Sequence, residues 1–111
     1  MTEPRLTAGF WVAAYLSRLR LADIPAFVTA KGDATAGAVI VKLNTLDGRA
    51  RAFHRSWTLE GARVWAVLAE GPEAEVDAAL ARQRGFDPDL WVIEVEDRAG
   101  RTLLDAQGLE A

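Results

Sequence analysis

Residues 49–69, RARAFHRSWTLEGARVWAVLA, decide the fold because the rest of the chain is arranged around them. Their pattern predicts two consecutive strands, 50–59 and 62–69, joined by a tight turn at Glu60-Gly61. The second strand is apolar on both faces, which is typical of a central strand covered from both sides. The stretch contains two of the four tryptophans, the only histidine and four of the eleven arginines. We therefore expect a hairpin with an unusual surface at the centre of a sheet.

The segments on either side of this hairpin predict two helices and three further strands. Apolar residues recur at helical spacing over 10–22, with Thr7 as N-cap and Pro25 beyond the end. A second helix begins at Gly71-Pro72 and ends before Gly85, with acidic residues in its first turn and arginines in its last. The further strands are predicted at 26–31, 38–44 and 90–97, and a short sixth strand is a candidate at 102–104.

The predicted order of elements is α-β-β-β-β-α-β. Four consecutive strands with short loops favour an antiparallel meander, and the helix before the fifth strand allows a crossover. The 111 residues are enough for one domain with a real core. We expect a single α+β domain over 1–111: a mostly antiparallel sheet of five or six strands with both helices packed on one face.

The composition is that of an ordinary globular protein and excludes several kinds of site. Half of the residues are hydrophobic and 26% are charged, which argues against disorder. Without cysteine the chain forms no disulfide, thiolate nucleophile, zinc–thiolate site or iron–sulfur cluster. Neither a signal peptide nor the ~20 apolar residues of a membrane span is present. We expect a soluble, cytoplasmic protein without a cofactor.

Aromatic and arginine side chains share one face of the predicted strand 50–59, and this face is the candidate interaction surface. Trp57 and Trp65 are difficult to bury together on one sheet face, and an exposed aromatic patch demands a partner. Arginine and tryptophan are enriched in interface hot spots. The leading hypothesis is a non-catalytic protein-interaction or accessory module, homodimeric through its sheet or bound to another protein. The residues of this surface would be Phe53, Arg55, Trp57 and Trp65.

The same strand supports nucleic-acid binding as an alternative. Arginine and aromatic groups on a sheet can hold phosphates and stack bases. The net charge of -3 argues against it, since nucleic-acid binders usually have a strongly basic domain or face. A simpler interpretation is amphipathic packing, in which the arginines pair with acidic residues of 94–97. The nucleic-acid surface would consist of Arg49, Arg51, Arg55 and Phe53.

His54 gives a third hypothesis, a hydrolase-like enzyme. A histidine can act as general base near pH 7 if an acceptor orients it and a nucleophile lies within reach. Ser56 is on the same strand face, but such residues are about 6.5–7 Å apart at the backbone. No nucleophile elbow surrounds Ser56. We therefore assign no catalytic residue and favour a protein that is not an enzyme.

Two further segments are weak candidates for ligand binding. The loop 31–37 lacks the G-x-x-x-x-G-K-[ST] pattern, and a strand rather than a helix follows it. An acidic group does not have the spacing of an EF-hand loop; its members are Asp87, Asp89, Glu94, Glu96 and Asp97. We assign no metal site to the chain.

Three strings of sequence resemble a known family of small alphaproteobacterial proteins. They are RLTAGFWVAAYLSRL at 5–19, IPAFVTAKGDATAGAVIVKLN at 24–44 and RQRGFDPDLWVIEVEDRAGRTLLD at 82–105. The family is known as domain of unknown function 1491, and the resemblance spans nearly the whole chain. It implies a bacterial, cytoplasmic protein made of a single domain. It implies no activity, substrate or site residue.

Overall fold

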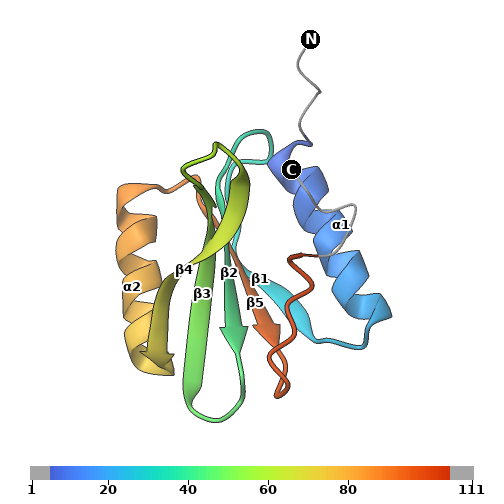
Figure 1. The fold of residues 1–111 in the computed structure, drawn as a ribbon, viewed down its shortest axis with the longest axis vertical. Helices are drawn as coiled ribbons and strands as arrows, with labels where there is room; N and C mark the ends of the chain where they lie inside the picture. The colour runs from blue at the N-terminus through green and yellow to red at the C-terminus, as the bar shows by residue number, and fades with distance from the viewer. Residues whose placement is uncertain (1–5, 106–111) are drawn as a thin grey trace.

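The protein folds around a five-stranded sheet that carries one helix on each face (Figure 1). The computed structural model describes residues 6–105. The order of elements and the mostly antiparallel sheet confirm the predicted α+β class, while residues 102–104 form no sixth strand. In chain order the elements are α1 (Ala8–Leu21), β1 (Ala26–Ala30), β2 (Val39–Asn44), β3 (Arg49–Trp57), β4 (Arg63–Pro72), α2 (Glu73–Phe86) and β5 (Trp91–Glu96).

β5, the last strand in the chain, lies inside the sheet. The strand order is β1-β5-β2-β3-β4, with β5 antiparallel to β1 and parallel to β2. The predicted meander is therefore wrong at its first step, because β5 separates β1 from β2. The burial of β5 explains its position: four of its six residues are buried, on both faces, as is typical of a central strand. Only β2, β3 and β4 form a meander.

The two helices cover opposite faces of the sheet, so the expectation that both would pack on one face is wrong. Val41 and Ile93 pack in the cluster that contains α1. Their neighbours in sequence, Ile40 and Val92, pack in the cluster that contains α2. Successive side chains of a strand point to opposite faces, so β2 and β5 present apolar residues on both. Each face therefore needs a helix of its own to cover it.

β4 lies at the edge of the sheet and is not the central strand that its apolar sequence suggested. Leu68 packs against the cluster beneath α2, and Trp65 packs against Trp11 of α1. Val64 and Val67 are exposed. Some of the apolar side chains of β4 therefore pack against the core, and the others remain at the surface.

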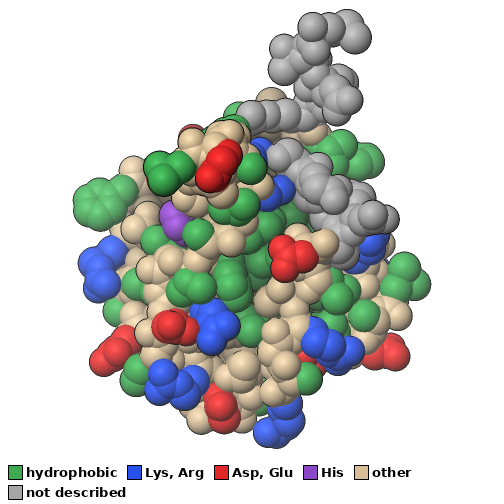
Figure 2. Space-filling view, in the orientation of Figure 1, with side chains coloured by type: hydrophobic (Ala, Val, Ile, Leu, Met, Phe, Trp, Pro, Cys, Tyr) green, Lys and Arg blue, Asp and Glu red, His purple; other side chains and the backbone are tan. Residues whose placement is uncertain are grey.

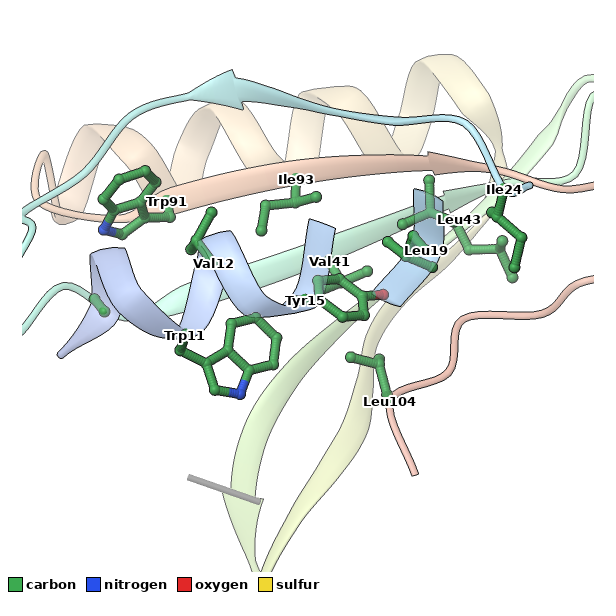
Figure 3. Packing of buried hydrophobic residues seen from close by; sticks show 12 residues of the cluster. Trp11, Val12, Tyr15, Leu19, Ile24, Val41, Leu43, Trp91, Ile93 and Leu104 are labelled. Atoms are coloured by element: carbon green, nitrogen blue, oxygen red, sulfur yellow. The ribbon is translucent and has the colours of Figure 1, made fainter. Parts of the chain in front are cut away.

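The cluster that contains the buried face of α1 is the larger of the two core clusters (Figure 3). Trp11, Tyr15 and Leu19 are one or two helical turns apart and belong to one buried cluster with Val41 and Ile93 of the sheet. The Trp11 and Tyr15 rings stack with their centroids 4.9 Å apart. The Tyr15 hydroxyl donates a 2.7 Å hydrogen bond to the Thr102 carbonyl and so ties the segment after β5 to the helix. Burial raises the pKa of Tyr15.

The helix ends agree in part with the sequence signals. Thr7 is the N-cap of α1, and its hydroxyl accepts a hydrogen bond of 3.3 Å from the amide of Phe10. Pro72 is the last residue of β4 and immediately precedes α2. Gly85 does not end α2, because the helix continues to Phe86.

β3 leaves β2 after Phe53 and continues with β4 as a two-stranded hairpin. The ladder between β2 and β3 ends at Phe53, whereas the ladder between β3 and β4 continues to Trp57 and Arg63. A β-bulge at Leu68 of β4, opposite Ala52 and Phe53, marks the departure, and bulges increase the local bend and twist of a strand pair. We call residues 54–66 the hairpin arm. Most of the residues singled out in the sequence lie on it or next to it.

Candidate functional site

One face of the β3–β4 pair is largely free of helix cover, and we call it the open face. Ala50 and Ala52 point toward α2, so the odd-numbered residues of β3 point away from it. Every residue of the two predicted binding surfaces lies on this face. Together with their cross-strand neighbours on β4, they define it as Arg49, Arg51, Phe53, Arg55, Trp57, Arg63, Trp65, Val67, Glu70 and Pro72.

The four residues of the predicted interaction surface differ in exposure. Trp57 is 60% exposed, so a large area of its side chain is in contact with solvent. Phe53 and Trp65 are half-buried against the α1 cluster, and the Trp65 ring lies 5.5 Å from the Trp11 ring. The Arg55 guanidinium lies over the Trp65 ring at 4.7 Å from its centroid, a cation–π contact. Of the four, Trp57 is the best placed to contact a partner.

The arginines of the open face are spread along its length. Arg51 forms an ion pair with Glu70, its cross-strand neighbour, with 2.8 Å between Nε and Oε2. The partner of Arg51 is thus on β4 and not among the acidic residues of 94–97. Figure 2 shows hydrophobic side chains gathered at the centre of its view, with positive and negative side chains around them. The open face therefore combines apolar area with an excess of arginine.

A cavity of about 550 Å³ lies where the hairpin arm departs from β2. Its lining comes from the start of α1, residues 35–40, the hairpin arm and the segment around the end of α2. Arg55, Arg63 and Trp65 belong to both the open face and this lining. The cavity exists because β3 no longer pairs with β2 beyond Phe53.

His54 lines the same cavity but has none of the partners that catalysis would need. Within residues 6–105 it makes no hydrogen bond or ion pair with another side chain, and none joins it to Ser56. The two residues lie on the same side of β3, opposite Ala66 and Val64. The part of the chain that the structure describes therefore assembles no catalytic dyad around this histidine.

The most densely charged cluster was not identified from the sequence. Lys42 on β2 is buried, and its ammonium nitrogen is 2.7 Å from Glu73 Oε2, 2.7 Å from Asp77 Oδ1 and 3.1 Å from Glu94 Oε1. Asn44 donates a further hydrogen bond of 3.1 Å to Glu73. We call this cluster the lysine cage. It joins β2, α2 and β5.

The carboxylates of the lysine cage keep Lys42 charged. Burial on its own would lower the pKa of Lys42, but hydrogen bonds to Asp77, Glu73 and Glu94 outweigh it, and the pKa is raised. A protonated lysine is neither a nucleophile nor a general base. The cage therefore has the character of a structural tie between three elements.

A signal for the lysine cage was present in the sequence. Lys42 is the single charged residue in the apolar segment 38–44, and a charge in a buried strand needs a partner. Glu73 and Asp77 are four residues apart and so share one face of α2. From the sequence, their position at the start of a helix indicated only a favourable interaction with the helix dipole. Their ion pairs with Lys42 were therefore not predicted.

Two further sequence expectations concern metals and membranes. Within residues 6–105, no group of three or more histidine, aspartate or glutamate side chains is placed to hold a metal ion. No helix in that range is both long enough and apolar enough to cross a membrane.

Comparison with known proteins gives a consistent result. A crystal structure of a DUF1491 family protein from Caulobacter crescentus CB15 is 41% identical, covers 90% of this chain and 95% of its own, and has a TM-score of 0.82. An NMR structure of a DUF1491 family protein from the same organism gives 40% identity, a TM-score of 0.77 and coverage of 90% and 93%. A protein of A. tumefaciens is 31% identical, with a TM-score of 0.70 and coverage of 84% and 86%.

Functionally curated proteins include no match to this chain. The family model of DUF1491, described as a protein of unknown function, matches residues 6–105. These residues span both helices, all five strands and the lysine cage. The chain therefore belongs to the DUF1491 family, whose function is unknown.

Proposed function

We propose that the protein is a non-catalytic interaction module that binds an acidic, partly apolar segment of another protein through the open face. The observation that carries the proposal is the composition of this face. It presents four arginines and one carboxylate, whereas the whole chain has a net charge of -3. The exposed Trp57 supplies an apolar anchor of the type that dominates binding energy in interfaces. We also propose that the module acts in the bacterial cytoplasm.

A second copy of the chain is the weaker candidate for the partner. A symmetric dimer places the same patch of both chains in contact. Through the open face, this arrangement would bring the four arginines of each chain together, and like charges repel. The homodimer expected from the sequence is therefore our secondary proposal. It would be seen as a dimer in sedimentation at high micromolar protein.

Nucleic acid fits the open face less well than an acidic protein segment. Proteins that bind single strands stack several bases on aromatic rings. Here Phe53 packs against the core, and Trp65 lies between Trp11 and Arg55. Trp57 is the aromatic residue of the open face that remains well exposed. A single well-exposed stacking platform on the open face favours a protein partner over a nucleic acid.

Selection from a displayed library of random twelve-residue peptides tests the proposal. We expect the peptides that bind to be enriched in aspartate and glutamate beside apolar residues. Their binding should be lost in Trp57→Ala and in Arg55→Glu, and retained in Phe86→Ala, which removes an even more exposed aromatic residue from α2. Peptides without acidic enrichment, or binding that survives both changes on the open face, would refute it.

Labelled single-stranded RNA provides the competing outcome. Binding measured by anisotropy at low salt, where electrostatic attraction is strongest, should be absent or weak. Tight RNA binding that weakens steeply with added salt and is lost in an Arg51→Glu/Arg55→Glu variant would replace the protein partner with nucleic acid.

A further inference from the structure

The outer side of β1 is an unpaired edge of the sheet. β1 is the first strand in the order β1-β5-β2-β3-β4, and among residues 6–105 no strand pairs with its other side. Its central residues Phe27 and Val28 are 46% and 38% exposed. An unpaired edge presents a row of amide and carbonyl groups that a second strand can bind. The proposed function depends on the open face and makes no use of β1.

β1 lacks the side chains that usually protect an edge. β4, the strand at the opposite edge, contains Arg63, Glu70 and Pro72, and charged residues and proline discourage pairing with a further strand. β1 has the sequence AFVTA, without charge or proline. A β-bulge after Val28 limits the regular part of its edge to residues 26–28. The chain therefore leaves a short, uncharged stretch of edge open.

The hydrogen bonds between β1 and β5 determine which backbone groups point outward. The Pro25 carbonyl accepts a 2.9 Å hydrogen bond from the Glu96 amide, so it faces β5. Backbone groups of successive residues in a strand point alternately to its two sides, so those of Phe27 also face β5. The amides and carbonyls of Ala26 and Val28 therefore point away from the sheet. Each of these two residues offers one donor and one acceptor on the open edge.

These outward groups are self-complementary. In an antiparallel pair of two copies with Phe27 opposite Phe27, Ala26 of each copy is opposite Val28 of the other. The resulting hydrogen bonds join each Ala26 amide to a Val28 carbonyl and each Val28 amide to an Ala26 carbonyl. The two Phe27 residues then form a non-hydrogen-bonded pair, the arrangement in which opposite side chains are closest.

The face of the sheet on which Phe27 lies has room for this aromatic pair. Phe27 is opposite Glu94 on β5, whereas its neighbour Val28 is opposite Ile93, which packs in the α1 cluster. Phe27 therefore lies on the face that carries α2. α2 packs against β3 and β4, and a groove of about 340 Å³ is lined by residues of both β1 and α2. The helix thus leaves the edge at β1 uncovered.

The charges at the two ends of β1 are complementary. Asp23 precedes the strand and Lys31 follows it, and neither forms an ion pair within residues 6–105. Both are equally far from Phe27 in sequence, so the antiparallel register places Asp23 of each copy opposite Lys31 of the other. A parallel pair would bring like charges together. The end charges therefore favour an antiparallel partner with the same sequence.

We propose that two copies of the chain pair through β1 and extend the sheet across a two-fold axis. The partner is a second copy, because the same sequence matches both the hydrogen-bonding groups and the end charges. This contact differs from a dimer through the open face, in which the four arginines of each chain would repel one another. A short edge buries little area, so the dimer belongs to the weak, transient class of interfaces. It leaves the open face of each copy free.

Sedimentation velocity of the full chain, from low to high micromolar protein, measures the equilibrium. We expect monomer and dimer to exchange, with the dimer prominent at high micromolar protein. Phe27→Lys should weaken dimerisation at least about tenfold, because it places like charges opposite each other. Val67→Lys is the matched control and should leave dimerisation unchanged, since Val67 is 48% exposed but lies on the open face. Trp57→Ala should abolish peptide binding and leave dimerisation unchanged.

Exchange of the end charges tests the register. Asp23→Lys and Lys31→Asp should each weaken dimerisation about tenfold, because each turns two attractive contacts into repulsive ones. The double variant restores opposite charges and should recover most of the lost affinity. In ¹⁵N-labelled protein, the amide hydrogens of Ala26 and Val28 should exchange more slowly with solvent as protein concentration rises. The amide spectrum of each variant verifies that it is folded.

Three results would overturn the proposal. The first is a chain that remains monomeric at high micromolar protein. The second is a dimer that Phe27→Lys weakens no more than Val67→Lys, which would place the contact away from β1. The third is a double charge variant that dimerises no better than the two single variants, which would refute the antiparallel register.

Discussion

Replacement of Lys42 by methionine is the sharpest test of the lysine cage. Methionine keeps the apolar stem of the side chain and removes the ammonium group, so the change isolates the charge. Three carboxylates then lose their common partner. Removing one member of a buried ion pair usually destabilises by 3–5 kcal/mol, on the order of the cost of an uncompensated charge.

The exposure of the three carboxylates sets the expected magnitude. The Asp77 side chain is 55% exposed and can turn to solvent, so its contact contributes at most about 1 kcal/mol. The Glu73 side chain, 37% exposed, contributes a similar amount, roughly 1 kcal/mol. The Glu94 side chain is only 17% exposed, and its charged hydrogen bond contributes about 1.5–3 kcal/mol. We expect a total loss of about 3 kcal/mol.

Urea unfolding at pH 7, followed by tryptophan fluorescence, measures this loss directly. In thermal unfolding, the same loss of stability should lower the melting temperature by roughly 10–15 °C. The matched control is Arg51→Met, which breaks the exposed pair with Glu70 and should change stability by no more than about 0.5 kcal/mol. Adding Glu94→Gln to Lys42→Met should recover part of the loss, because it removes the least solvated charge. A loss below about 1 kcal/mol in Lys42→Met would refute the reasoning.

Two further predictions concern alkaline pH and close packing. Because the folded pKa values of Lys42 and Tyr15 are raised, their stabilisation is present at neutral pH and declines as pH rises above the ordinary values of 10.5 and 10.0. Urea unfolding should therefore show a free energy of unfolding that falls above about pH 10. The decline should be shallower in Tyr15→Phe. A free energy of unfolding that does not change with pH in this range would contradict the prediction. A Cβ at Gly32 would overlap the Asp89 carbonyl, so Gly32→Ala should destabilise by at least about 2 kcal/mol in thermal unfolding. Gly85→Ala meets no neighbouring atom inside α2 and should stabilise by up to about 1 kcal/mol, and the opposite order of the two changes would show that local packing is misjudged.

The elements of this fold were predictable because each carries a local signal. Helical spacing of apolar residues located α1, and the Glu60-Gly61 turn located the hairpin. The position of β5 was not predictable by the same reasoning, which assumes that consecutive strands are neighbours. A strand pattern gives the residues that are buried but not the strands that lie beside them. The two-sided burial of β2 and β5 depends on that neighbourhood, and so does the placement of the helices.

Some features of the candidate site were predictable from local sequence patterns, and others were not. The alternation along β3 correctly grouped the arginine and aromatic residues on one face, because alternation is a property of a single strand. Stacking of Arg55 on Trp65, by contrast, depends on the register between two strands, and the cavity depends on where β3 leaves β2. The lysine cage brings together residues up to 52 positions apart. Pairings of this length are not visible in a local pattern.

The central position of β5 has a consequence for how the chain can fold as it is synthesised. β2, β3 and β4 can pair as soon as they emerge, since they are consecutive neighbours. α1 and β1 cannot complete their contacts, because the residues of β5 that α1 covers, among them Ile93 and Val95, are made last. The first third of the chain must therefore wait, with its apolar face uncovered, until β5 enters between β1 and β2. The native five-stranded sheet is complete only when β5 lies between β1 and β2.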